Sequence, residues 1–362
     1  MKQKGTSTSS RWIARWRGLT GVSLAGVVFL SSLMAVAAPW QANINGALGI
    51  DANSIERSQN PEDYRFLSDY QDPNDLIQAE IALNTRMPAE GSVLLKGNPV
   101  VGGSQKVTLF GMRSEKMQYG GTMGAVVSAT QAVSLAEALT ENGFSVNPTM
   151  TDFYQSLADT YTPGTMPNAN CVNENGGFRV NEVPISEYGE DLKASYAEYQ
   201  DAAIIVLGRD ATEGSDYYPG EDGQLSQAEA EAQQLSYTPE FTQSSTGNVL
   251  SLSDNERDLI EYVKQQGFEK IIVLLNADNS LESQELKQDD AISSILWIGT
   301  PGCYGTYGIA QLLAGTAQPS GHLTDTYAVN TAKAPAVVNF GAYPFANASE
   351  IDTTPNNALR SN

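Results

Sequence analysis

Four charged side chains crowd one short stretch of the sequence, GRDATEGSD at residues 208–216. The stretch continues the apolar run AAIIVL and contains Arg209, Asp210, Glu213 and Asp216. A carboxyl group in such a place can give a proton to a bound substrate or take one from it, whereas an arginine beside carboxylates can also form a plain structural ion pair. From the residues alone, we favour the ion pair and keep a proton-transferring carboxylate as the alternative.

The other motifs of the chain do not favour metal, nucleotide or triad chemistry. The acidic segment DYYPGEDG at residues 216–223 lacks the alternating oxygen ligands and the final glutamate of an EF-hand calcium loop. The glycine-rich segment YGGTMGA at residues 119–125 fits neither the dinucleotide fingerprint nor a phosphate-binding loop. The single histidine, His322, leaves little from which to build a catalytic triad or a multi-histidine zinc site. We therefore expect no cofactor and no metal.

The charge balance and the cysteines limit the partners and the covalent links of the chain. The net charge is −21, and without the five basic residues ahead of the first apolar run, the remaining 16 basic and 42 acidic residues leave −26. Such an acidic surface repels nucleic acid, so we expect no nucleic-acid partner. Cys171 and Cys303 show no metal-ligand spacing, and both a disulfide between them and two separate thiols stay open.

An alternation of strands and helices must position the charged stretch. Apolar strand candidates occur in QKVTLFG, DAAIIVLG, KIIVLLNAD and AISSILWIG, and helical segments separate them. The segment SDNE predicts the start of one helix, because Glu256 follows Ser253 by three positions, the spacing of a capping box. The pattern predicts an α/β fold, a mostly parallel sheet with helices on both faces. Because ligands bind beyond the carboxyl ends of such strands, the charged stretch lies where a site would be built.

The N-terminal 38 residues are typical of a targeting segment. After several basic residues, residues 18–38 form an uncharged run, GLTGVSLAGVVFLSSLMAVAA. At ~1.5 Å per residue this run is long enough to cross a ~30 Å hydrocarbon core, and the positive flank favours a cytoplasmic N-terminus with the rest of the chain outside. The AVA at residues 35–37 also fits a signal-peptide cleavage site. We favour a retained membrane anchor because the run is longer than a signal peptide needs, and a secreted form is the alternative.

We divide the chain into four parts from these signals. They are a signal peptide or anchor at residues 1–38, an exposed connector or short helices at 39–80, the α/β sandwich domain at 81–345 and a polar tail at 346–362.

The segments at the ends of the predicted strands, taken in order, resemble the α/β sandwich domain of glycoside hydrolase family 3, the β-glucosidase-like enzymes. The segments are AEGSVLLKGN, KVTLFG, AAIIVLGRDATEGSD, LSDNERDLIEYV, KIIVLLNADN and ISSILWIGTPGCYGTYGIAQLLAGTAQPSGHLTDTY, within residues 80–345. PGCYGTYG and PSGHLTDTY depart from the family's usual Pro-Gly-Gln-Glu-Gly-Gly and Pro-Ser-Gly-Arg-Leu-Pro-x-Thr-Phe. We therefore carry no family role over to Cys303 or His322.

The resemblance implies a role for the charged stretch. In many members of the family, a Glu-Gly-x-Asp element in the loop after the corresponding strand carries the general acid/base, and Glu213 in TEGSD matches it. The resemblance thus implies that Glu213 is catalytic, with Arg209 and Asp216 as substrate-binding residues that shape the pocket or orient the loop. In the family, the nucleophilic aspartate lies in a separate barrel domain, in a motif of the Ser-Asp-Trp type that does not occur in these 362 residues.

The expected function is that of an extracytoplasmic, retaining β-glucosidase-like hydrolase, represented here by the domain that supplies the acid/base. Its substrate would be a β-glucoside-like carbohydrate, and a barrel domain in cis or in trans would supply the nucleophile, in an inverted or truncated arrangement. Residues 18–38 would hold the chain in the membrane. The alternative is a non-catalytic cell-surface module that binds glycans or another partner.

Overall fold

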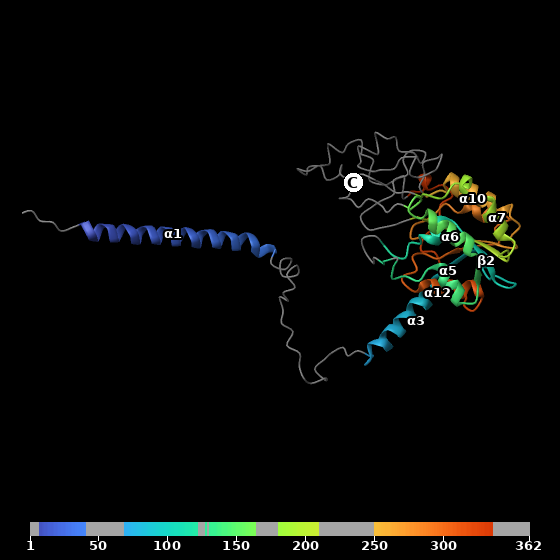
Figure 1. The fold of residues 1–362 in the computed structure, drawn as a ribbon, viewed down its shortest axis with the longest axis horizontal. Coiled ribbons are helices and arrows are strands. Elements are labelled where there is room, and N and C mark those ends of the chain that lie inside the picture. Colours follow the sequence, from blue (N-terminus) through green and yellow to red (C-terminus); the bar gives the residue numbers. More distant parts are fainter. Residues whose placement is uncertain are drawn as a thin grey trace, which may run out of the picture. The chain divides into compact units, whose positions relative to one another are not determined.

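The computed structural model describes residues 7–40, 69–121, 127–128, 130–163, 180–209 and 250–335. The contacts divide the chain into two compact units, Met1–Gln71 and Asp72–Asn362, and each is described by itself. Both are drawn in Figure 1.

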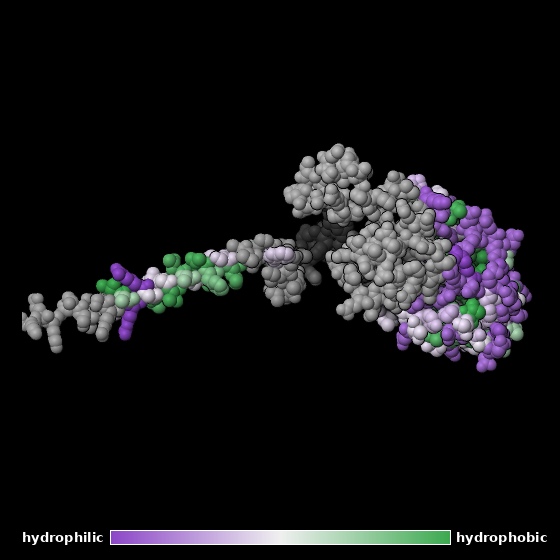
Figure 2. All heavy atoms as spheres, turned by 90° about the horizontal axis from the view of Figure 1, so that it is seen from above, coloured by the Kyte–Doolittle hydropathy of each residue, from purple (hydrophilic) through white to green (hydrophobic). Residues whose placement is uncertain are grey.

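The first unit is dominated by the helix α1 (Ser7–Ala37), which a 3-10 turn, η1 (Ala38–Trp40), follows. Its span Trp12–Met34 is long and apolar enough to cross a membrane, although an N-terminal signal sequence would pass the same test. The described side chains of this span are all exposed, and many are hydrophobic in the view of Figure 2. The helix therefore agrees with an anchor or a signal segment and does not distinguish the two.

A six-stranded sheet forms the centre of the second unit in the part of the chain that the structure describes. The strand order is β1-β6-β5-β4-β2-β3; β1 is antiparallel to β6, and the other neighbouring strands are parallel. The strands are β1 (Val93–Gly97), β2 (Lys106–Phe110), β3 (Ser145–Val146), β4 (Ala202–Arg209), β5 (Ile271–Ala277) and β6 (Ser294–Trp297). The mostly parallel sheet expected from the sequence is confirmed.

Helices cover both faces of this sheet. One face carries α6, α7 and α10, and the other carries α5 and α12, with α3 packed against α12 (Figure 1). The helices of this unit and its 3-10 turns are α3 (Pro73–Gly91), α4 (Met112–Glu115), α5 (Leu135–Glu141), α6 (Pro148–Leu157), η3 (Ile185–Glu187), α7 (Glu190–Tyr196), α10 (Asp254–Lys264), α11 (Gln284–Gln288), α12 (Gly305–Ala314) and η4 (Thr331–Lys333).

The side chains of β4 show why this strand is apolar throughout. Ile205 and Leu207 belong to the core on the α6, α7 and α10 face, and Ile204 and Val206 belong to the core on the other face. Successive side chains of a strand point to opposite faces, so a strand covered on both sides needs an unbroken apolar run. The register of this buried strand fixes Arg209, its last residue, at the carboxyl edge of the sheet.

The helix α3 begins inside the segment that we expected to be an exposed connector or short helices. Asp72 caps this helix by accepting a hydrogen bond from the backbone N–H of Asn74, and Pro73 occupies the first helical turn, where its missing N–H costs nothing. Residues 73–80 therefore belong to a 19-residue helix that packs on α12.

Candidate site at the carboxyl edge of the sheet

A buried ion pair holds the end of β4. The guanidinium of Arg209 has no exposed surface, and its two terminal nitrogens donate to the two carboxylate oxygens of Glu256, each at 2.7 Å. The same nitrogens donate to the backbone carbonyls of Gly208 at 2.8 Å and Ser251 at 2.7 Å. A two-pronged pair of this kind fixes both distance and orientation. The point at which the chain leaves β4 is thus held in one place.

The carboxylate of Glu256 has a second task at the start of α10. Its Oε2 accepts a hydrogen bond from the backbone N–H of Ser253 at 2.7 Å, and Ser253 Oγ accepts one from the N–H of Glu256 at 3.1 Å. This is the capping box that the sequence predicts, and the structure confirms it. One buried carboxylate therefore fastens the first turn of α10 to the end of β4.

A second buried glutamate, Glu182, lies at the exit of β2. Its carboxylate accepts hydrogen bonds from the backbone N–H of Met112, at 3.0 Å to Oε2, and from that of Val183 at 3.0 Å. Its backbone carbonyl accepts a hydrogen bond from the side chain of Asn255, the second residue of α10, at 2.9 Å. Glu182 therefore connects the chain after β2 with the start of α10.

The surroundings of Glu182 favour its neutral form. Burial raises its pKa from 4.5 to about 8, and the nearby carboxylate of Glu256 acts in the same direction. The N–H groups of Met112 and Val183 and the charge of Arg113 act against this rise without cancelling it. A carboxyl group with a pKa near neutrality at the functional edge of a parallel sheet is a candidate for a role beyond packing.

The exit of β2 also requires a glycine. Gly111 has a φ of +87°, and a Cβ at this position would lie 2.4 Å from the backbone oxygen of Val206. Its N–H donates to the hydroxyl of Tyr154 at 2.7 Å, and this hydroxyl is hydrogen-bonded to that of Tyr188. Burial raises the pKa of both tyrosines well above 10, so both hydroxyls stay protonated at neutral pH.

A neutral side-chain amide holds the chain where it leaves the next strand, β5. The side-chain oxygen of Asn276 accepts a hydrogen bond from the N–H of Gln118 at 2.8 Å. Its nitrogen donates to the carbonyls of Gln118 at 2.9 Å and Gly299 at 2.6 Å. A single buried asparagine thus connects the end of β5 with the chain after β2 and the chain after β6.

The structure describes one of the three site residues expected from the sequence. Glu213 and Asp216 lie outside the described residues, as does Cys171. Arg209 is described, and its fully buried side chain forms an ion pair with Glu256; its expected role in binding substrate or orienting the loop stays a prediction. Cys303 is a partly exposed free thiol.

Glu182 and the pairing of Glu256 with Arg209 were missed by the sequence analysis. Glu256 had a local signal, the capping box, but nothing local indicates a partner 47 residues away. Glu182 lies in a polar segment that reads as a loop and carries no motif.

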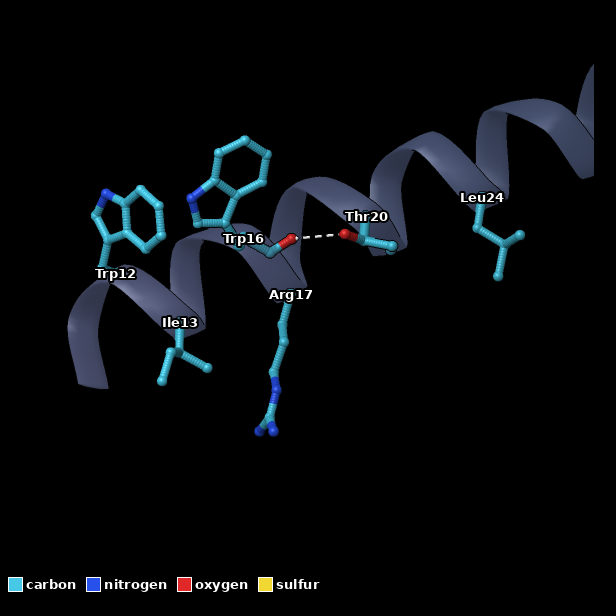
Figure 3. A pocket seen from close by; sticks show the side chains of 7 residues that line it. Trp12, Ile13, Trp16, Arg17, Thr20 and Leu24 are labelled. Carbon is cyan, nitrogen blue, oxygen red and sulfur yellow. Dashed lines mark hydrogen bonds between the residues drawn. The ribbon is translucent and has the colours of Figure 1, made fainter. Parts of the chain in front are cut away.

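Three of the pockets are lined by described residues, and Arg209, Glu256 and Glu182 line none of these three. The first, about 410 Å³, is lined by α1 alone, and Figure 3 shows the rings of Trp12 and Trp16 beside each other along one side of that helix. The second, about 530 Å³, lies between α11 and residues 323–329, and the third lies between α3 and the α12 region. In the part of the chain that the structure describes, no group of three His, Cys, Asp or Glu side chains could hold a metal ion.

Comparison with known proteins points to one family. Residues 92–354 match the family model of the glycosyl hydrolase family 3 C-terminal domain. Beta-glucosidase A of Butyrivibrio fibrisolvens is 29% identical over 271 residues, which are 73% of this chain and 30% of that protein. A beta-glucosidase of Ruminococcus albus is 23% identical over 276 residues, 74% of this chain and 25% of that protein. The chain therefore spans less than a third of the length of either relative.

The solved structures agree on the fold. Beta-glucosidase 3B from Thermotoga neapolitana in complex with glucose superimposes with a TM-score of 0.53 at 24% sequence identity, over 73% of this chain and 33% of that chain. A beta-glucosidase from Paenibacillus barengoltzii gives the same TM-score and identity over 72% of this chain and 25% of that chain.

Proposed function

Because this chain belongs to glycosyl hydrolase family 3, we propose that it supplies the general acid/base of an extracytoplasmic, retaining β-glucosidase-like enzyme, with Glu213 as the catalytic residue. The observation that carries the proposal is the fixed end of β4. Arg209, four residues before Glu213, is held by two charge-assisted bonds at the edge where parallel sheets bind ligands. A catalytic carboxyl group on the following segment needs a rigid support of this kind to hold its position.

In this mechanism Glu213 acts twice. Protonated, it gives its proton to the leaving glycosidic oxygen while a second carboxylate attacks the anomeric carbon; ionised, it then activates the water that releases the sugar. The pairing of Arg209 with Glu256 supports this role, since a compensated positive charge lowers the pKa of a neighbouring carboxyl less than an unpaired one would. Asp216 would contact the substrate or orient the loop that carries Glu213.

The proposal includes two partners. A barrel domain, in cis or in trans, supplies the nucleophilic carboxylate, and α1 holds the enzyme in the membrane through residues 18–38, with the α/β unit outside the cytoplasm. The exposed apolar span and its basic N-terminal flank support this orientation. Beta-glucosidase relatives support a β-glucoside-like substrate.

The test is hydrolysis of 4-nitrophenyl β-glucoside by the full chain, alone and together with a family barrel domain supplied as a separate chain. We expect almost no turnover by the chain alone and sustained turnover with the barrel. Glu213→Gln should remove this turnover, whereas Glu221→Gln, in the acidic segment that follows, should not.

Two results would contradict the proposal. Turnover by the chain alone that is lost in Glu213→Gln would mean that the nucleophile comes from within these residues. Glucose binding in a calorimeter without hydrolysis in any combination would identify the chain as a glycan-binding module.

A further inference from the structure

The two buried glutamates at the carboxyl edge are linked through consecutive residues of α10. Asn255 donates to the backbone of Glu182, and the next residue, Glu256, holds Arg209. The carboxylate of Glu182 holds Met112 at the exit of β2. A displacement or a new charge at Glu182 therefore reaches the end of β4 through the first turn of α10.

The charged and titratable groups around Glu182 come from several elements. Glu256 on α10 and Arg113 on α4 act on its carboxyl group, and the carboxyl group acts on the hydroxyls of Tyr154 on α6 and Tyr188 after η3. Both hydroxyls are neutral at physiological pH. The charge around Glu182 is therefore set by two carboxyl groups, those of Glu182 and Glu256, and by the arginines.

We propose that Glu182 is a positioning residue for the site at the end of β4. The loss of its proton at alkaline pH then disturbs the arrangement of that site. The neutral carboxyl group accepts the hydrogen bonds of Met112 and Val183 and adds no negative charge beside the pair of Glu256 with Arg209. Ionisation adds a second negative charge beside Glu256, in surroundings where charges are poorly screened. The repulsion weakens the hold of Glu256 on Arg209 and on the start of α10.

The direct test follows the guanidinium of Arg209 by nitrogen-15 NMR of the full, deuterated chain in detergent micelles. Its signal is identified by its loss in Arg209→Lys, and burial slows the exchange of its protons enough for detection at alkaline pH. In the wild-type chain, we expect the Arg209 signal to shift with one transition near pH 8, and in Glu182→Gln to stay constant over the same range. Glu182→Asp, which keeps an ionisable group, should restore a transition with a displaced midpoint.

Controls separate this coupling from a general effect of pH. Glu269→Gln, at an exposed position, should leave the Arg209 transition as in the wild-type chain. The partly exposed pair of Arg257 with Glu285 provides a second arginine on α10 whose signal should show no transition near pH 8. A constant Arg209 signal in the wild-type chain, or an unchanged transition in Glu182→Gln, would overturn the proposal, and the first result needs no variant to fold.

A functional measurement extends the test and rests on the proposed function. The glucose affinity of the chain together with a family barrel domain, measured by calorimetry, should fall about fivefold or more from pH 6 to pH 9 with the wild-type chain and stay level with Glu182→Gln. Equal falls in both chains would overturn the role of Glu182 in the site. Absence of turnover in the presence of the barrel domain, together with an intact Arg209 transition, would contradict the proposed function and support the coupling.

Discussion

The carboxyl ends of β4 and β5 are neighbours in the sheet, but charged groups hold one and neutral groups hold the other. Arg209 ends β4 in a buried ion pair with Glu256, and Asn276 ends β5 in three hydrogen bonds to backbone groups. An ion pair fixes orientation strongly but responds to every charge that changes nearby, whereas an amide does not. The charged end is the one that leads toward Glu213. We therefore expect the end of β4, which leads to the proposed catalytic residue, to respond to pH. The end of β5 should not respond.

The largest effect should come from breaking the ion pair. Glu256→Ala leaves the charge of Arg209 buried without this partner and removes the capping box of α10, so we expect a loss of about 3–5 kcal/mol in the free energy of unfolding, measured by urea titration. Replacing both residues of this pair, Arg209→Met with Glu256→Leu, should recover much of this loss because neither charge of the pair remains buried. A loss below about 1 kcal/mol in Glu256→Ala would mean that the pair does not hold the end of β4.

Removing the neutral side chain of Asn276 should lower the free energy of unfolding by somewhat less. Asn276→Ala leaves the N–H of Gln118 and the carbonyls of Gln118 and Gly299 without this partner, and we expect a loss of about 3 kcal/mol in the same measurement. Asn279→Ala is the matched control, because in the described part of the chain the amide atoms of Asn279 have no hydrogen-bond partner. Equal losses in the two variants would show that the bonds of Asn276 are not what stabilises this edge.

Stability measured as a function of pH should distinguish the end of β4 from the end of β5. The folded state holds a proton on Glu182 between pH 4.5 and about 8 that the unfolded chain has released, so its stabilising contribution is complete below pH 4.5 and is lost as pH rises through 8. From pH 5 to pH 7, wild-type stability should therefore fall by about 2–3 kcal/mol relative to Glu182→Gln. Parallel pH curves for the two chains would contradict the raised pKa of Glu182, and Asn276→Ala should keep the pH dependence of the wild-type chain.

The smallest effect should come from an ion pair on the surface of the same helix. Arg257 on α10 bonds Glu285 at 3.0 Å and Asp254 at 3.3 Å, and its side chain is 34% exposed. Water and salt screen such pairs, so Arg257→Ala should cost less than about 1 kcal/mol. A loss as large as that of Glu256→Ala would show that burial is not what distinguishes the charged end of β4.

Local patterns in the sequence predicted the elements that position the site. The unbroken apolar run before Arg209 predicted a strand covered on both faces, and the spacing of Ser253 and Glu256 predicted the capping box. Both follow from interactions within a few residues. The start of α3 was missed although its signals, Asp72 before Pro73, were present, because the surrounding segment is polar.

Partners distant in the chain could not be predicted in this way. The pairing of Glu256 with Arg209 depends on the packing of α10 beside β4, and the burial of Glu182 depends on three elements meeting at one edge. Glu182 has no helical or strand periodicity around it, so its sequence context resembles that of a solvated loop. The same context gives no indication of its raised pKa, which arises from burial.

The central claim, that Glu213 is the general acid/base, is tested most directly by chemical rescue of Glu213→Gln. The full chain with a family barrel domain is assayed on 2,4-dinitrophenyl β-glucoside, whose leaving group needs no proton, in the presence of azide, a nucleophile that needs no base. We predict that azide restores much of the lost rate and that β-glucosyl azide is the product. A rate in Glu213→Gln equal to that of the wild-type chain without azide, or a lost rate that azide does not restore, would contradict the account.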